Sequence, residues 1–403
     1  MIRLDEDISY KYIKTRLNMR IRVPHYYKDF KCIGAECTDT CCAGWEVVID
    51  DKSYKYYKKV PGDFGQRLKA TMIATNENSF VLQNGNCPFL NEMKLCDIYT
   101  ELGKDKLCET CKNYPRFIEE YGDLREIGIS LSCMEAARLI ITNRGPVIFD
   151  LEKNSEMITT YNNINPELFM QLMVARKKAI DILQNRSIDF NHRIVLLLAF
   201  TRNMQEKIDD DKLSQITNVV NQYSQVDFVE QFMNELDTYK DNGLEKYNNM
   251  SKYMDIYSGL EKINDNWPLI INHALECLHK FNNESTFFAQ QYSDFDVYHQ
   301  DKVDEYEHLM VYFVFRYYLK AVYDEDIYTK VKMAVVSFLI IKELDIVRWI
   351  DNGYKFDVAD QIDIIHMYSK EIEHSDMNLE ALAEALKSNE IFDMEHLIVM
   401  LMN

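Results

Sequence analysis

The sequence predicts a mainly α-helical protein with a small, irregular N-terminal domain over residues 1–150 and an α-helical bundle domain over residues 151–403. Nine of the ten cysteines lie between positions 32 and 133. Five of the seven prolines also lie in the first 150 residues, which indicates short elements joined by turns. After residue 165, apolar residues recur three and four positions apart, as they do on one face of an amphipathic helix.

The helical pattern begins at Pro166, because proline is favoured at the first position of a helix. The same periodicity predicts further helices at His192–Lys207, Phe228–Tyr239, Leu269–Phe281, Val303–Tyr323, Asp326–Val347, Val358–His374 and Asn378–Met402, with Asp376 capping the last of them. Alternating residues in the N-terminal domain predict short strands at Phe80–Leu82, Arg125–Leu131 and Val147–Leu151.

Composition and charge restrict the function classes. The net charge of −19 argues against a nucleic-acid partner, and an acidic surface tolerates basic protein substrates. No apolar stretch approaches the ~20 residues needed to span a bilayer, although peripheral membrane association stays open. Met1–Tyr10 does not resemble a secretory signal, so we expect a cytoplasmic protein.

The cysteines are the most informative residues of the chain. In a reducing cytosol, closely spaced cysteines are more often metal ligands or redox groups than disulfides. A chain of 403 residues with 47% hydrophobic content also has no need of disulfide staples. We therefore expect a metal-stabilised N-terminal domain, with these candidate metal ligands: Cys32, Cys37, Cys41, Cys42, Cys87, Cys96, Cys108, Cys111 and Cys133.

The spacing of the cysteines leaves the number of sites open. Neighbouring side chains diverge by about 100° on a helix and about 180° on a strand, so Cys41 and Cys42 would not readily chelate one ion. Cys37 and Cys41 share a face if their segment is helical, and Cys108 and Cys111 form a C-x2-C unit. Nine thiolates allow two four-ligand sites with one spare, or one cluster plus structural or redox cysteines.

Two common templates do not match. Radical S-adenosylmethionine enzymes usually present C-x3-C-x2-C, but Gly44 stands where the third cysteine is required. Zinc ribbons need two C-x2-C pairs, and this sequence has one. No histidine lies between Cys32 and Cys133, so the donor set is all thiolate, which suits zinc and iron–sulfur centres alike.

The order of the cysteine motifs resembles a known family. FKCIGAECTDTCCAGW, CPFL, LCDIYTELG, LCETCKNYPR and SLSCMEAARL follow one another over roughly residues 19–145. They resemble the zinc- or iron-chelating cysteine-cluster family, and within it the flagellin lysine N-methylases. The first group is looser than the compact family spacing, and Met134 stands where that branch has proline.

This resemblance implies a protein lysine N-methyltransferase that methylates lysine side chains of flagellin in the cytosol, with S-adenosylmethionine as the donor. It also implies a 4Fe-4S iron–sulfur cluster, with zinc as the alternative, bound by the cysteines named above. The sequence assigns neither a catalytic base nor a donor-binding site, because no Gly-rich nucleotide fingerprint is present. The sulfonium is expected near the cluster or between the two domains, and direct polar or redox-assisted transfer both remain possible.

Methyl transfer requires the neutral amine of lysine, whose free pKa is about 10.4, so a site must desolvate it or supply a base. The candidates beside the cysteine motifs are Asp97, Tyr99, Tyr114, Tyr121 and Glu135, for which packing or support of the metal ligands is the simpler role. The alternatives to a methyltransferase are a noncatalytic metal-binding or redox-sensing adaptor and a zinc-stabilised scaffold. Further residues that we considered are Trp45 and Phe89 as pocket or miniature-core residues, Arg116 as a carboxylate partner, and Cys277 as a buried thiol.

Overall fold

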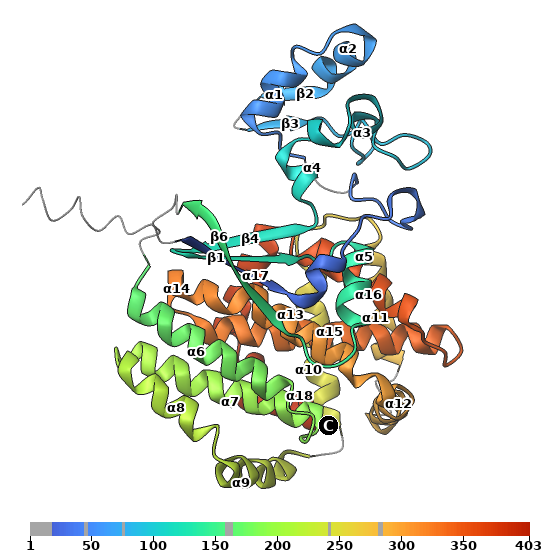
Figure 1. The fold of residues 1–403 in the computed structure, drawn as a ribbon. Helices are drawn as coiled ribbons and strands as arrows, with labels where there is room; N and C mark the ends of the chain where they lie inside the picture. The colour runs from blue at the N-terminus through green and yellow to red at the C-terminus, as the bar shows by residue number, and fades with distance from the viewer. Residues whose placement is uncertain (1–17, 44–46, 75–76, 158–163, 241–242, 281–284) are drawn as a thin grey trace, which may run out of the picture.

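The computed structural model describes residues 18–403 except 44–46, 75–76, 158–163, 241–242 and 281–284. The chain is mainly α-helical, which confirms the fold class predicted from the sequence. A lobe of short helices and strands projects from a larger helical body, and a four-stranded sheet lies on the side of the body that faces the lobe (Figure 1).

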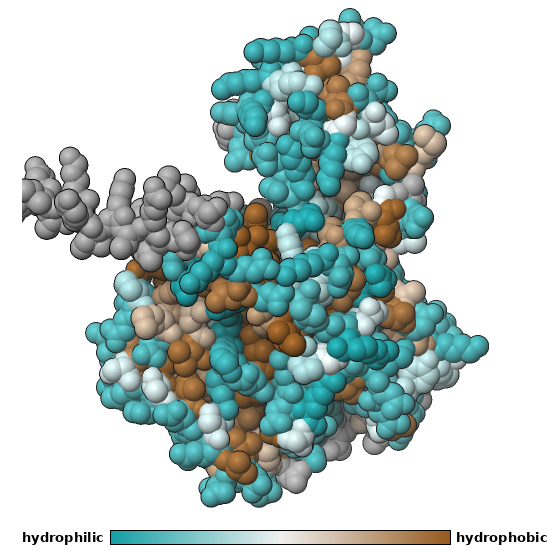
Figure 2. Space-filling model, viewed as in Figure 1, coloured by the Kyte–Doolittle hydropathy of each residue, from teal (hydrophilic) through white to brown (hydrophobic). Residues whose placement is uncertain are grey.

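The lobe contains α1 (Asp51–Tyr57), α2 (Gly62–Thr71), β2 (Met72–Ala74), β3 (Asn78–Phe80), α3 (Asp97–Leu102) and α4 (Glu109–Asn113). It has its own small core, in which Tyr57, Leu68, Phe80 and Phe89 are almost fully buried. Cys87 and Cys108 belong to the same core. Hydrophilic residues cover most of the visible face of the lobe (Figure 2), so its apolar side chains are concentrated inside.

The sheet is formed by β1 (Asn18–Pro24), β4 (Arg116–Tyr121), β5 (Leu124–Ile129) and β6 (Phe149–Met157). Its order is β4-β5-β1-β6, with β1 parallel to β5 and antiparallel to β6. The predicted strands correspond to β3, β5 and β6 with shifted ends, whereas β1, β2 and β4 were not predicted.

The body is built from the remaining helices. They are α5 (Met134–Ile141), α6 (Pro166–Leu183), α7 (Phe190–Asp209), α8 (Ile216–Gln222), α9 (Val226–Leu236), α10 (Leu244–Ser258), α11 (Trp267–Lys280), α12 (Ser285–His299), α13 (Val303–Tyr317), α14 (Ala321–Asp324), α15 (Ile327–Asp351), α16 (Val358–Ile372), α17 (Asp376–Ser388) and α18 (Met394–Met402). Short 3₁₀ turns lie at His25–Asp29, Gly34–Glu36, Lys104–Lys106, Leu213–Gln215, Asp237–Tyr239, Gln300–Lys302, Tyr318–Lys320 and Glu390–Phe392.

One continuous core joins the sheet and α5 to these helices. Leu131 and Ile140 from the N-terminal region are fully buried in the same cluster as Leu197, Leu309 and Ile340. The division of the chain at residue 150 stays a prediction. Within the described ranges, no helix has both the length and the apolar character needed to cross a membrane.

Several predicted helices are wrong in their extent, and the predicted Phe228–Tyr239 ends in a 3₁₀ turn at Asp237–Tyr239. The segment predicted as Val303–Tyr323 is interrupted by the 3₁₀ turn at Tyr318–Lys320. The segment predicted as Asn378–Met402 divides into α17 and α18, because Asn389 adopts an extended conformation and accepts a hydrogen bond from the Ile391 N–H at 3.2 Å. The cap of α17 is Ser375 instead of Asp376, since the Ser375 hydroxyl accepts the Asn378 N–H at 3.1 Å.

Candidate metal centre

All ten cysteines lie in the described part of the chain, and none forms a disulfide there. Nine of them, which we call the cysteine cluster, come from three places in the fold. Cys32, Cys37, Cys41 and Cys42 lie on residues 31–43, the linking segment between β1 and the lobe. Cys87, Cys96, Cys108 and Cys111 belong to the lobe, and Cys133 precedes α5 of the body.

The tertiary structure brings these distant cysteines into one electrostatically connected group. Cys111 is hydrogen-bonded to Cys108 and interacts with Cys42 and Cys96. Cys87 interacts with Cys96 and Cys108. The linking segment therefore meets both cysteine-bearing loops of the lobe.

A second set of electrostatic interactions reaches the body. Besides burial, interactions with Cys37 and Cys41 raise the pKa of Cys133, and an interaction with Cys32 raises the pKa of Cys37. Cys41 also contacts its neighbour Cys42, so the adjacent pair connects the two sets of thiols. The cluster consequently extends from the core of the lobe to the start of α5.

Burial controls the protonation of these thiols. Desolvation raises the pKa of Cys87 to about 11 and that of Cys133 to about 12. The hydrogen bond with Cys108 raises the pKa of Cys111, while the same bond lowers the pKa of Cys108. Without a cation, most of these groups are neutral at pH 7, so a metal that binds them must displace protons.

Backbone amides partly oppose this effect. Cys96, Cys108 and Cys133 occupy the residue before α3, α4 and α5, where N–H groups are not used by the helix. Burial raises the pKa of Cys96, but the N–H groups of Ile98 and Tyr99 act in the opposite direction. These positions favour a thiolate once the proton has left.

The separation of the sulfurs limits how they can bind metal. Among the residues that the structure describes, no three of the nine sulfurs all lie within 4.8 Å of one another. A tetrahedral zinc ion with Zn–S bonds of about 2.3 Å holds its sulfurs roughly 3.8 Å apart. The arrangement in this structure is therefore wider than a closed three- or four-cysteine zinc site.

Asp39 attaches the linking segment to the helical body. Its carboxylate lies 2.5 Å from His366 Nε2 and 2.7 Å from Lys370 Nζ, and both partners belong to α16. Burial disfavours the charge on Asp39, but the hydrogen bonds from His366 and Lys370 hold its pKa well below the usual range. Cys37 and Cys41 flank Asp39 and are placed against α16 by this contact.

A buried polar network continues from Cys133 into the body. The hydroxyl of Tyr114 donates to the Ser132 carbonyl at 2.6 Å, and His374 Nε2 lies 2.7 Å from Ser132 Oγ. Burial lowers the pKa of His374 to about 4, so its imidazole is neutral at pH 7. Ser130 extends the network through a 3.1 Å hydrogen bond from Arg316.

Glu373 lies at the inner end of this network. Its carboxylate accepts hydrogen bonds from Tyr317 at 2.7 Å and Ser369 at 2.6 Å, and it pairs with Arg316 at 3.1 Å. These hydrogen bonds connect α13 to the end of α16. The network orients the residues that adjoin Cys133.

The other residues proposed from the sequence have structural contacts. Asp97 pairs with Arg67 at 2.7 Å, and Glu135 pairs with Arg138 at 2.7 Å. Tyr99 is 51% exposed, and Phe89 lies in the core of the lobe. Tyr121 stacks on Phe169, and Arg116 donates a hydrogen bond to the Tyr27 hydroxyl at 3.1 Å. Trp45 lies outside the described residues.

Sequence reasoning missed His366, Lys370, His374, Arg316 and Glu373. One signal was present, because His366, Lys370 and His374 are spaced four residues apart and share one face of the predicted helix.

A cleft of about 190 Å³ lies elsewhere, and Asp189, Asp296, His299 and Lys342 are among its lining residues. It does not include the cysteine cluster.

Comparisons with known proteins find relatives of this chain. A lysine-N-methylase of Salmonella choleraesuis (strain SC-B67) is 26% identical over 206 residues, which are 49% of this chain and 51% of that protein. A lysine-N-methylase of Salmonella typhimurium gives the same identity and coverage. The chain thus spans about half the length of these curated relatives.

The flagellar biosynthetic protein FliU of Salmonella muenchen is 30% identical over 128 residues, which are 30% of this chain and 76% of that protein. No solved structure matches the chain. The sequence model of the FliB lysine N-methylase C-terminal domain matches residues 176–400, more than half of the chain, and includes α13 and α16. This chain therefore belongs to the FliB lysine N-methylase C-terminal domain family.

Proposed function

We propose that this protein is a lysine N-methyltransferase that methylates lysine side chains of flagellin, with S-adenosylmethionine as the methyl donor. Family membership over residues 176–400 and the names of the relatives support the reaction class. The observation that carries the proposal is the contact of Asp39 with His366 and Lys370. It joins the segment that carries Cys37 and Cys41 to the family-matched region, which supports a site built from both.

We propose a 4Fe-4S cluster as the cofactor, with zinc as the alternative. The all-thiol donor set supports a polynuclear iron–sulfur centre, in which each thiolate binds a different metal atom. When bound, the cluster supplies a redox-active iron centre. The thiols held on the core of the lobe are Cys42, Cys87, Cys96, Cys108 and Cys111, and those nearer the body are Cys32, Cys37, Cys41 and Cys133.

The chain's own residues prepare a lysine for transfer. A lysine amine must lose its proton before it attacks a methyl group, and desolvation lowers its pKa. Ser132 is 1% exposed and Tyr114 is half-buried, so little water reaches the region beside Cys133. The net charge of −19 attracts a lysine-rich protein surface before the amine is desolvated.

The experiment uses full-length protein that is purified anaerobically and reconstituted with iron and sulfide. Radiolabelled S-adenosylmethionine and unmodified flagellin are added, and labelled lysines are located by mass spectrometry. We expect iron and acid-labile sulfide in the protein and label on flagellin lysines. Cys111→Ser should lose the cluster and the activity, whereas Met93→Ala, at a side chain in the lobe that is 69% exposed, should retain both.

Iron-replete, folded protein that transfers no label to flagellin would overturn the methyltransferase proposal. Retained flagellin binding without turnover would instead indicate a noncatalytic adaptor. Colourless anaerobic protein with stoichiometric zinc and no sulfide would overturn the iron–sulfur assignment and indicate a zinc-supported site. Metal analysis and label transfer are separate measurements, so the cofactor and the reaction are tested independently.

A further inference from the structure

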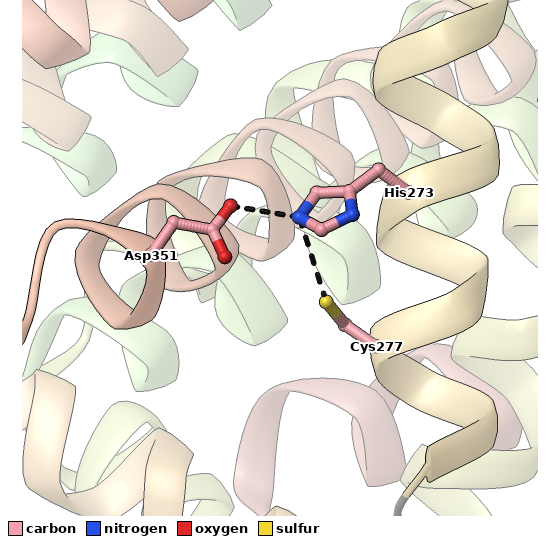
Figure 3. Close-up of side chains that lie close together, drawn as sticks. All are labelled: His273, Cys277 and Asp351. Atoms are coloured by element: carbon pink, nitrogen blue, oxygen red, sulfur yellow. Dashed lines mark hydrogen bonds and ion pairs between the residues drawn. The ribbon is translucent and has the colours of Figure 1, made fainter.

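Three side chains of kinds that bind metals, none of them in the cysteine cluster, meet where α11 contacts the end of α15. His273 and Cys277 are four residues apart on α11 and therefore lie on the same face of that helix. Asp351 is the last residue of α15. Figure 3 shows the three side chains pointing toward one another from the two helices.

The contacts converge on a single ring nitrogen. His273 Nε2 lies 2.8 Å from Asp351 Oδ2 and 3.8 Å from Cys277 Sγ, and the three ligand atoms all lie within 4.8 Å of one another. A Cys-His-Asp catalytic triad needs the two different nitrogens of the imidazole, one for the thiol and one for the carboxylate. Because both partners face Nε2, this group is not arranged as such a triad (Figure 3).

We propose that His273, Cys277 and Asp351 form a binding site for a divalent transition-metal ion of the zinc class. One imidazole nitrogen, one thiolate and one carboxylate oxygen are typical zinc ligands, and thiolate disfavours magnesium and calcium. Three protein ligands leave the fourth tetrahedral position to water. When the metal binds, the Cys277 thiol loses its proton to solvent and the sulfur donates its electron pair to the ion.

Burial and helix electrostatics support this assignment. Cys277 is 9% exposed, whereas the side chains of His273 and Asp351 are 43% and 44% exposed, so an ion can enter from solvent onto a thiol fixed in the protein. Asp351 lies at the C-terminal end of α15, where the helix dipole disfavours a carboxylate. A divalent cation would offset that repulsion and connect α11 to α15.

Cobalt(II) is the probe, because a cobalt–thiolate bond gives an intense charge-transfer absorption. The full-length protein is first loaded anaerobically at its cysteine cluster, and Co²⁺ is then titrated while iron content is monitored. We expect one additional equivalent with a thiolate band, and displacement of Co²⁺ by Zn²⁺. His273→Ala should weaken binding by at least about 100-fold, and Cys277→Ser should remove the thiolate band.

His279→Ala is the matched control, since His279 is an exposed histidine on the same helix outside the group of three. It should bind Co²⁺ as the wild type does. Equal stoichiometry, affinity and spectra for the wild type and His273→Ala would overturn the proposal. If Cys277→Ser does not fold, His273→Ala decides the outcome, because its partly exposed side chain can be removed without opening the core. The result does not depend on methyl transfer.

Discussion

Replacing Asp39 with asparagine tests whether the cysteine cluster functions only when it is docked on the helical body. The substitution keeps the shape of the side chain and removes its charge. His366 and Lys370 are 5% and 8% exposed at their side chains, so neither side chain gains full access to water in the variant. Lys370 also lies 3.4 Å from the Thr40 carbonyl, a contact that the substitution does not remove.

The expected cost follows from the burial of the three groups. Removing one partner of a fully buried ion pair costs about 3–5 kcal/mol, and an exposed pair contributes about 0.2–1 kcal/mol. The side chain of Asp39 is 37% exposed, and the amide oxygen of asparagine still accepts one hydrogen bond. We therefore expect the free energy that holds the linking segment on the body to fall by about 2 kcal/mol. This is roughly a 30-fold shift in the equilibrium constant for docking of the segment.

Two assays measure this effect. Urea denaturation gives the change in the free energy of unfolding, and label transfer to flagellin gives the change in activity at constant iron content. Asp63→Asn is the matched control, because Asp63 is an exposed acidic residue of α2 in the lobe. A double-mutant cycle with Lys370→Met should show that the second substitution costs less once Asp39 has been changed.

One result would refute the reasoning. If both Asp39→Asn and Asp63→Asn retain wild-type stability and activity, the contact with α16 does not support the site. A stability loss without any change in label transfer would restrict the contact to a structural role. Iron content separates these cases from loss of the cluster itself.

Three further predictions concern the two cores and a buried acid. Phe89→Ala should cost about 3–5 kcal/mol and release iron, because Phe89 is fully buried in the small core of the lobe; full iron retention would contradict this. Ile340→Ala should destabilise the body by about 2–5 kcal/mol, whereas Leu269→Ala, at a residue 66% exposed, should change its free energy of unfolding little. Burial raises the pKa of Glu305 from 4.5 to about 7, so the folded state retains a proton that the unfolded state loses. Stability should therefore fall as pH rises from 4.5 through 7, and Glu305→Gln should remove up to about 3 kcal/mol of that fall; an unchanged slope in urea denaturation would count against it.

Much of the helical body was predictable because its helices are long and strongly periodic. The helix at Pro166–Leu183 begins where it was predicted to begin, since Asn165 caps it and Pro166 occupies its first turn. The break between α17 and α18 was missed because apolar residues continue through Glu390–Phe392, where Phe392 is fully buried although the chain is not α-helical. The spacing of apolar residues indicates which residues are buried, but a short turn can bury the same residues as a continuous helix.

The sequence by itself determined the chemistry of the candidate site, because nine cysteines without histidine among them specify a thiol donor set wherever the chain places them. It also determined the helical class through the spacing of apolar residues. Only the tertiary structure decided that Asp39 contacts Lys370, 331 positions away, and that Cys277 and His273 meet Asp351. Such contacts join separate helices and loops, and they depend on how whole elements pack instead of on any local pattern of residues.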